Sequence, residues 1–319
     1  MKVIPSSLSG FVIRYSNKSA QCLMDRISPM VCKLCLQDKP LANSHIIPKF
    51  VGKWLKDSSA TGYLRCAENP NVRKQDLPTQ KLLCYDCENL FSQWENAFAK
   101  EIFLPFQENN KIKFKYDVWL LKFAISIVWR IGVVKIDNFR SRNSYLSAKI
   151  DEALEYWRNF LLGNSTLNEY EHHLLFLDVI ADTQSEIPVG FHWYTLRGTD
   201  ATIVSNDQHV FIYGKIPGMI FFSSVHPLHL QGWEKTKIHQ RGHMSAGKQK
   251  IKDEIFGNFL LDRAQKAMTV GGSLSSRQEQ KIVDALLENP ERTNNSKTLV
   301  ILEIEQLSIE ERIKRNSNK

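Results

Sequence analysis

The chain lacks the apolar segments that secretion or membrane insertion requires. Near the N-terminus, residues 8–13 are too short and too interrupted to form the hydrophobic region of a signal peptide. The longest apolar run, residues 118–134, carries Lys122 and Arg130, whereas a membrane helix needs about 20 largely uncharged residues. We therefore expect a cytoplasmic protein without a membrane partner, and a buried helix over this run.

Internal repeats and a Gly-rich P-loop are also absent, so the sequence does not indicate a P-loop nucleotide site. Two cysteines, Cys22 and Cys66, follow no partner pattern and are predicted to be small buried hydrophobic residues. Residues 1–29 are Ser-rich and weakly patterned, which predicts a loose N-terminal arm. The 319 residues are enough for two domains with a substantial core.

Cysteine is scarce, but four of the six cysteines form two Cys-x-x-Cys pairs. Cys32 and Cys35 make the first pair, and Cys84 and Cys87 make the second after a gap of 48 residues. Two such pairs supply the four thiolates of a tetrahedral zinc site. A reducing cytosol disfavours disulfides, and a thioredoxin-like redox site uses only one such pair. We therefore predict a structural Zn²⁺ on these four cysteines.

The residues beside the two pairs resemble the HNH endonuclease family. Leu41-Ala-Asn-Ser-His45-Ile-Ile-Pro48 follows the first pair, and Leu83-Cys84-Tyr-Asp-Cys87-Glu88 contains the second. The resemblance covers about residues 30–98, and it is closest to a bacterial subgroup that reads Ser-His-Ile-Ile-Pro and Leu-Cys-x-x-Cys-Glu. It implies a treble-clef ββα-metal nuclease that hydrolyses DNA, in phage defence or mobile-element biology. His45 would be the general base, opposite a catalytic Mg²⁺ or Mn²⁺ ion.

Three positions differ from the family pattern: Ser44, Thr79 and Glu88. The family usually has Asp or His before its catalytic His, Asn about five residues before the third Cys, and His directly after the fourth. The carboxylate of Glu88 suits Mg²⁺ or Mn²⁺ better than His does, which makes Glu88 the candidate ligand of the catalytic ion. The same departures motivate the alternative function, a non-catalytic zinc module that binds nucleic acid or a partner protein.

Further oxygen ligands for such an ion lie nearby in the sequence. Glu95 ranks behind Glu88, because it lies two helical turns later, roughly 10 Å along the axis. Asp76 or Asn71, in the polar loop, are candidates for the missing ligand. For His45, the alternative to catalysis is a hydrogen bond that stabilises a turn.

Positive charge is concentrated in the N-terminal third of the chain. The formal net charge is +8, and residues 1–100 hold 14 Lys and Arg against 8 Asp and Glu. This excess suits a polyanion, with DNA as the expected partner and RNA as the alternative. The predicted phosphate contacts are Arg65, Arg73, Lys74 and Lys81. A solvated insertion is the competing interpretation of this stretch.

The resemblance implies a small HNH-like zinc module at residues 30–105, and periodicity predicts an α+β fold for the chain. A larger α+β domain, residues 106–319, is expected to hold several helices and a small antiparallel sheet. The sequence assigns no role to it, and any contact with a partner protein or any oligomerisation is expected there. Helices are predicted over residues 50–55, 83–104, 116–134, 147–162, 169–180, 253–268, 275–287 and 305–315. Strands are predicted over residues 41–47, 63–64, 190–196, 209–213 and 219–225.

Overall fold

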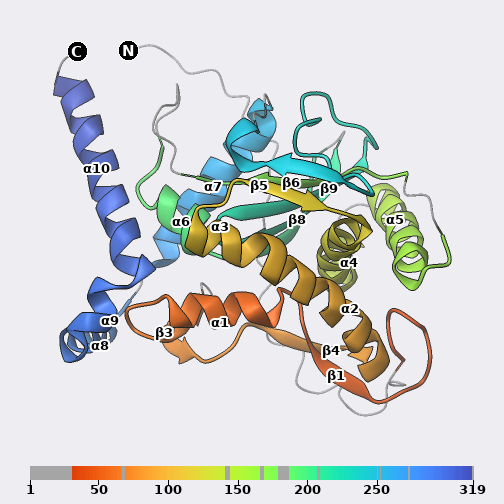
Figure 1. Cartoon of the computed structure of the whole chain (residues 1–319), viewed down its shortest axis with the longest axis horizontal. Helices are drawn as coiled ribbons and strands as arrows, with labels where there is room; N and C mark the ends of the chain where they lie inside the picture. The colour runs from red at the N-terminus through yellow and green to blue at the C-terminus, as the bar shows by residue number, and fades with distance from the viewer. Residues whose placement is uncertain are drawn as a thin grey trace.

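The computed structural model describes most of the chain after the predicted N-terminal arm. The described residues are 31–66, 69–140, 144–165, 169–178, 187–206, 209–249, 251, 253–271 and 274–317. Within them the protein is α+β, as predicted, with helices packed around small antiparallel sheets (Figure 1). The arm, residues 1–29, and Cys22 lie outside the described residues.

The elements follow one another along the chain as helices and short strands. The helices are α1 (Lys49–Asp57), α2 (Tyr85–Phe98), α3 (Leu104–Asn109), α4 (Val118–Arg140), α5 (Ser144–Leu162), α6 (Phe191–Arg197), α7 (Glu254–Gly271), α8 (Ser276–Glu288), α9 (Pro290–Asn294) and α10 (Lys297–Ser317). The strands are β1 (Leu41–His45), β2 (Leu64–Cys66), β3 (Asn69–Lys74), β4 (Thr79–Cys84), β5 (Lys113–Tyr116), β6 (His172–Phe176), β7 (Asp200–Ser205), β8 (Val210–Ile216), β9 (Met219–His226) and β10 (Gly242–Ser245).

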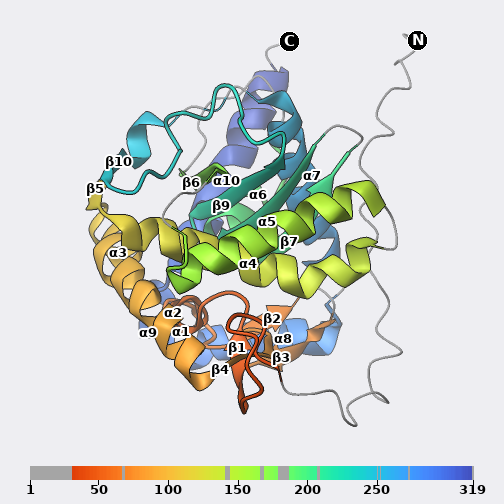
Figure 2. The same ribbon diagram turned by 90° about the vertical axis from the view of Figure 1, so that its right-hand side faces the viewer.

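The largest sheet is antiparallel and has the strand order β6-β9-β8-β7. Its central strands, β8 and β9, form a hairpin around Pro217 and Gly218, and Gly218 has the positive φ that such a tight turn requires. Helices α4 and α5 lie over one face of the sheet, and α7 lies behind it (Figure 2). Because both faces are covered, β8 and β9 are almost continuously apolar.

The apolar run at residues 118–134 forms the buried helix α4, as predicted. Asp117 starts the helix by accepting a hydrogen bond from the backbone N–H of Trp119 (3.1 Å). At Gly132, a Cβ atom would lie only 2.5 Å from Leu154 of α5 and 2.9 Å from Ile212 of β8. This glycine therefore allows the close approach of α4 to both neighbours. Among the described helices, none is long and apolar enough to cross a membrane.

Two predicted elements were wrong. Residues 169–178, the described part of the helix predicted at 169–180, do not form a helix: residues 172–176 are β6, which pairs with β9 at the edge of the sheet. Residues 190–196 do not form a strand but helix α6. The N-terminal N–H groups of α6 are satisfied by the carboxylate of Glu305 on α10, which accepts from Gly190 (3.0 Å) and His192 (2.7 Å). Both outcomes depend on residues far away in the sequence.

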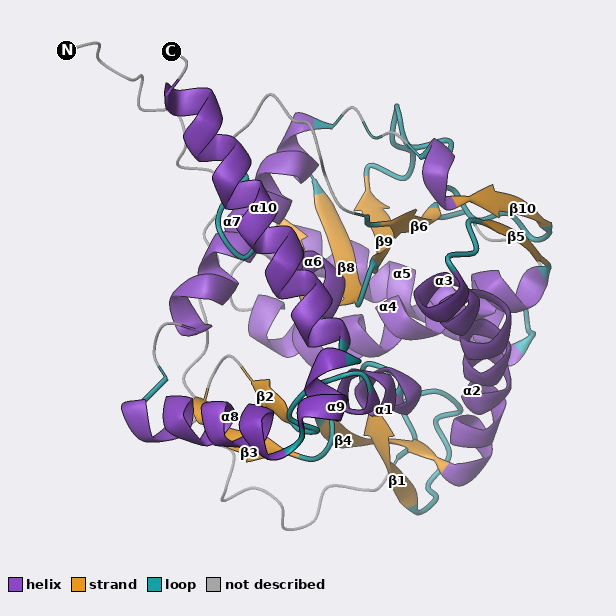
Figure 3. Cartoon of the chain, turned by 60° about the vertical axis from the view of Figure 1, so that its left-hand side comes forward, coloured by secondary structure: helices purple, strands orange, loops and turns teal. Residues whose placement is uncertain are grey.

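The predicted zinc module and the rest of the chain share one hydrophobic core. The ring of Phe98 on α2 stacks on Phe123 of α4, with centroids 4.1 Å apart, and meets Phe221 of β9 edge-on at 5.5 Å. The C-terminal segment also returns to the module, where α8 lies against the β2–β3 hairpin (Figure 3). The domain boundary at residue 105 thus remains a prediction, with side chains from both sides in contact.

Arg130 joins three elements from the middle of α4. Its side chain is only 1% exposed, and its Nη1 lies 2.8 Å from Glu95 Oε1 on α2. The same nitrogen donates to the backbone carbonyl of His45 at the end of β1 (2.8 Å). Its guanidinium also lies over the ring of Phe91. Arg130 therefore fixes α2 and β1 relative to α4.

We predict that Arg130→Ala lowers the free energy of unfolding by about 3 kcal/mol or more, because it leaves Glu95 without its partner in a largely buried pair. The matched control is Arg140→Ala, on the same helix. Arg140 is 48% exposed and pairs with Asp137 and Asp151 at the surface, so its loss should cost at most about 1 kcal/mol. Urea unfolding curves measure both values. Equal, small decreases in the free energy of unfolding of the two variants would contradict the structural role of Arg130.

Candidate functional site

The structure brings the four predicted cysteines together. The sulfur atoms of Cys32, Cys35, Cys84 and Cys87 all lie within 4.8 Å of one another. The Sγ atoms of Cys35 and Cys84 are 3.8 Å apart, far longer than a disulfide of about 2.05 Å. A zinc tetrahedron with Zn–S bonds of about 2.3 Å places its sulfurs about 3.8 Å apart. These cysteines are therefore positioned to hold a zinc ion.

Backbone geometry explains how two distant pairs converge. The turn that carries the first pair is closed by Cys32 N–H to Gln37 O (3.0 Å), and it is joined to β4 by Lys33 N–H to Leu82 O (3.0 Å). The second pair spans the junction at which β4 ends and α2 begins, so Cys87 lies in the first helical turn. The three segments meet around the sulfurs.

The electrostatics of this cluster favour a bound cation. Burial raises the pKa of Cys87 far above its usual range, and it also raises the pKa of Cys35. Cys32 behaves differently: burial opposes its ionisation, but backbone N–H groups, among them that of Cys84, lower its pKa to about 7. Four thiolates this close repel one another unless a cation neutralises them, and Zn²⁺ suits four sulfur ligands.

His45 lies at the far end of β1 and pairs with an acidic residue from the β3–β4 loop. Its Nε2 is 3.0 Å from Oδ2 of Asp76; the His45 side chain is 16% exposed and that of Asp76 is 47% exposed. Burial opposes the ionisation of Asp76, but the contact with His45 and the N–H of Leu77 outweigh it, so the pKa of Asp76 is lowered. Asp76, predicted as one option for a metal ligand, is thus the partner of His45.

The two glutamates of α2 have different surroundings. Glu88 is half-buried in the first turns, and its Oε1 is buried without a hydrogen-bond partner among the described residues. Glu95 is paired with Arg130, whose Nη1 lies 2.8 Å from both Glu95 Oε1 and the His45 carbonyl oxygen, so these oxygens are within about 5.6 Å. Glu95 is therefore near the His45 backbone, whereas the buried Oε1 of Glu88 has no hydrogen-bond partner among the described residues.

Ser44 and Thr79, which differ from the HNH pattern, both lie on the paired strands β1 and β4. Ser44 is fully buried, and its Oγ accepts a hydrogen bond from the backbone N–H of Leu83 (3.1 Å), which ties β1 to β4. Thr79 faces His45 across the same strand pair. Asn71, on β3, accepts a hydrogen bond from the backbone N–H of Ser275 (2.8 Å), which attaches this strand to the start of α8.

The predicted phosphate-binding residues do not form one uniform surface. Arg65 and Arg73 both lie over the ring of Tyr63, and their guanidinium groups also contact α8. Lys81 donates to the carbonyl of Leu41 (2.8 Å), whereas Lys74 is exposed. The described part of this stretch forms the β2–β3 hairpin, in which Cys66 is half-buried rather than buried as expected.

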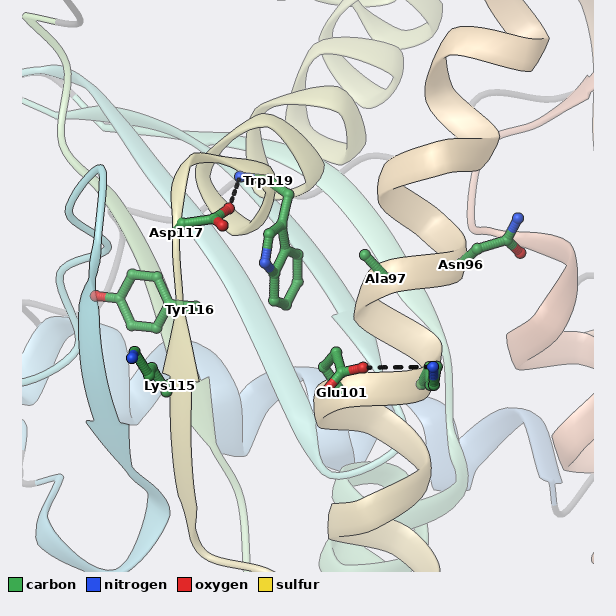
Figure 4. Close-up of a pocket in the computed structure, with 8 residues that line it drawn as sticks. Asn96, Ala97, Glu101, Lys115, Tyr116, Asp117 and Trp119 are labelled. Carbon is green, nitrogen blue, oxygen red and sulfur yellow. Dashed lines mark hydrogen bonds and ion pairs between the residues drawn. The ribbon is translucent and has the colours of Figure 1, made fainter.

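A groove of about 660 Å³ lies between the end of α2 and the start of α4 (Figure 4). In it, Lys100 and Glu101 form an ion pair at 4.0 Å, and Trp119 closes one side. Its lining residues are Asn96, Ala97, Lys100, Glu101, Lys115, Tyr116, Asp117 and Trp119. Because none of these residues belongs to the predicted site, the groove adds nothing to the chemistry of His45.

Comparisons with protein-family models, with curated proteins and with solved structures found no match to this chain. The sequence did not lead us to Arg130, which donates to the backbone carbonyl of His45. The available signal was a lone arginine within a strongly apolar run.

We predict one tightly bound zinc per chain, lost when one ligand is removed by Cys87→Ser. The remaining three thiols cannot complete the tetrahedron, so zinc should fall well below one equivalent. Cys66→Ser is the matched control, because Cys66 lies outside the cluster, and it should retain the metal. Elemental analysis of the purified proteins measures both. Full zinc in Cys87→Ser would show that the ion is held elsewhere.

Proposed function

We propose that this protein is a metal-dependent phosphodiesterase of HNH type that cleaves DNA, with His45 as the general base. The observation that carries the proposal is the 3.0 Å contact between His45 Nε2 and the ionised Asp76 carboxylate. An acidic partner orients an imidazole and stabilises the imidazolium that forms when it takes a proton. Because Nε2 faces the Asp76 carboxylate at 3.0 Å, outside hydrogen-bond geometry, we assign the proton of the attacking water to Nδ1.

The structure supports this role through the elements around His45. The backbone carbonyl of His45 accepts a hydrogen bond from buried Arg130, so the end of β1 is held in place. The four cysteines fix the junction of β4 and α2, which keeps Glu88 on a defined helical turn. The zinc itself takes no part in the chemistry.

Glu88 also fits the proposed catalytic cation, because its buried Oε1 has no hydrogen-bond partner among the described residues. When bound, a Mg²⁺ or Mn²⁺ ion would neutralise charge that develops on the phosphate. The setting in phage defence or mobile-element biology is part of the proposal and rests on the family resemblance alone.

We predict that His45→Ala lowers the rate of plasmid cleavage by about 10² to 10⁴, the usual contribution of a general base. Asp76→Asn should lower it less, because the imidazole remains but loses its charged partner. Supercoiled plasmid is incubated with each protein in Mg²⁺, Mn²⁺ or Ni²⁺, and nicked product is measured over time. His239→Ala, at an exposed site, is the control and should cleave like wild type. Unchanged cleavage by His45→Ala would overturn the proposed base.

The alternative is a zinc module that binds nucleic acid or a partner protein without cleaving. The contacts of Arg65 and Arg73 with Tyr63 and α8 favour it, because they order a basic hairpin at the surface. This alternative predicts binding of DNA in the presence of divalent metals and no nicking. Metal-dependent nicking that disappears in His45→Ala would exclude it.

We predict that Lys74→Ala weakens DNA binding and reduces the slope of log affinity against log salt by about 1, as expected for one lost phosphate contact. Lys135→Ala, at an exposed position of α4, is the matched control for charge. Fluorescence anisotropy over a series of salt concentrations measures the slopes. Equal slopes for Lys74→Ala and Lys135→Ala would show that the β2–β3 hairpin is not a preferred phosphate-binding site.

A further inference from the structure

A second polar cavity, of about 350 Å³, lies beside the edge strand β6. Its walls come from the start of β6 and from the loop at residues 229–237. Glu171, His173 and Lys237 line it from within, and His229 and Glu234 stand at the solvent side. These residues play no part in the proposed nuclease site.

His173 presents an unshared nitrogen lone pair in this cavity. Its side chain is completely buried, and burial lowers its pKa to about 4, so the ring is neutral at pH 7. Nδ1 lies 3.0 Å from Oγ1 of Thr236, and that hydroxyl donates its own proton to the carbonyl of Trp233 (2.8 Å). Nδ1 must therefore carry the ring proton. Nε2 is left as an acceptor, with no hydrogen-bond partner among the described residues.

A second acceptor lies close to this lone pair. Oε2 of Glu171 is 3.7 Å from His173 Nε2. Glu171 is largely buried and ionised, because Lys237 Nζ (2.6 Å) and the backbone N–H of Leu230 (3.1 Å) donate to its oxygens. Two electron-rich atoms that face each other in a buried site are stabilised by a cation between them.

The distance between these atoms suits a first-row transition ion. Bonds from zinc to nitrogen or oxygen are about 2.0 to 2.2 Å, which puts two tetrahedral ligands about 3.4 Å apart, close to the 3.7 Å observed. The outer contacts also match a metal site: the ligating ring donates its other N–H to a fixed oxygen, and the carboxylate is hydrogen-bonded in turn.

We propose that this cavity binds a divalent transition-metal ion of the Zn²⁺ or Co²⁺ type through His173 Nε2 and Glu171. His229, which is 74% exposed and has its Nδ1 3.1 Å from Glu171 Oε1, turns inward to supply a third ligand. Lys237 competes with the metal for the Glu171 carboxylate. The site is thus separate from the four cysteines and weaker than they are.

The test uses full-length protein that retains one Zn²⁺ per chain after dialysis, so that the cysteines are filled. Co²⁺ is then titrated in, and bound cobalt is measured by equilibrium dialysis and by its visible absorption. We expect one further equivalent per chain in wild type and a loss of at least tenfold in affinity in His173→Gln. Thr236→Val should weaken binding by about 10- to 100-fold, the usual effect of removing such an outer contact.

His172→Gln is the matched control. His172 directly precedes His173 on β6 and is equally buried. Successive residues of a strand point to opposite faces, so the two rings lie on different sides of the sheet. Its Nδ1 lies 2.6 Å from Ser223 Oγ, and its ring packs on Trp157. This variant should lose as much stability as His173→Gln and still bind cobalt. Equal loss of cobalt in both variants would overturn the proposal.

Lys237→Met gives a second readout that does not depend on a fully buried side chain. Removing the competing cation leaves Glu171 free for the metal, so cobalt affinity should rise, at least severalfold. A purely structural Glu171–Lys237 pair predicts no such increase. Unchanged or weaker cobalt binding in Lys237→Met, or no second equivalent in wild type, would contradict the proposed site.

Discussion

Mutual repulsion among four closely spaced cysteine thiolates is the constraint on which the N-terminal half of the structure depends. Cys32, Cys35, Cys84 and Cys87 lie within 4.8 Å of one another, a spacing that thiolates tolerate only around a cation. The cluster joins a turn, the end of β4 and the start of α2. The positions of His45, on the strand paired with β4, and of Glu88, on α2, follow from that junction.

Arg130 connects this junction to the rest of the molecule. It is buried on α4, the helix that covers the large sheet, and its guanidinium holds both α2 and the end of β1. The His45 environment is therefore built by residues from both predicted domains.

The sequence predicted best those features that depend on local spacing. The clustering of the cysteine pairs and the buried apolar helix α4 were confirmed, because spacing along the chain specifies each one. The wrong elements depended on distant partners: β6 exists because β9 pairs with it, and α6 is capped by Glu305 from α10. A single sequence does not reveal such contacts.

A single sequence also fails to reveal the partners of His45 and His173. The partner of His45 was one of several acidic candidates in the sequence, and only the fold brings Asp76 to it. His172 and His173 lie in the stretch that was predicted as a helix, residues 169–180. In the strand that forms instead, the two rings occupy opposite faces, and His173 meets Glu171.

The central claim, that four sulfurs surround one ion, is tested most directly by X-ray absorption at the zinc K-edge on protein that holds one zinc per chain. The account predicts a single shell of four sulfur ligands at about 2.3 Å. A shell of nitrogen or oxygen ligands, or fewer than four sulfurs, would contradict it. In that case, the junction of β4 and α2 would be held by packing alone.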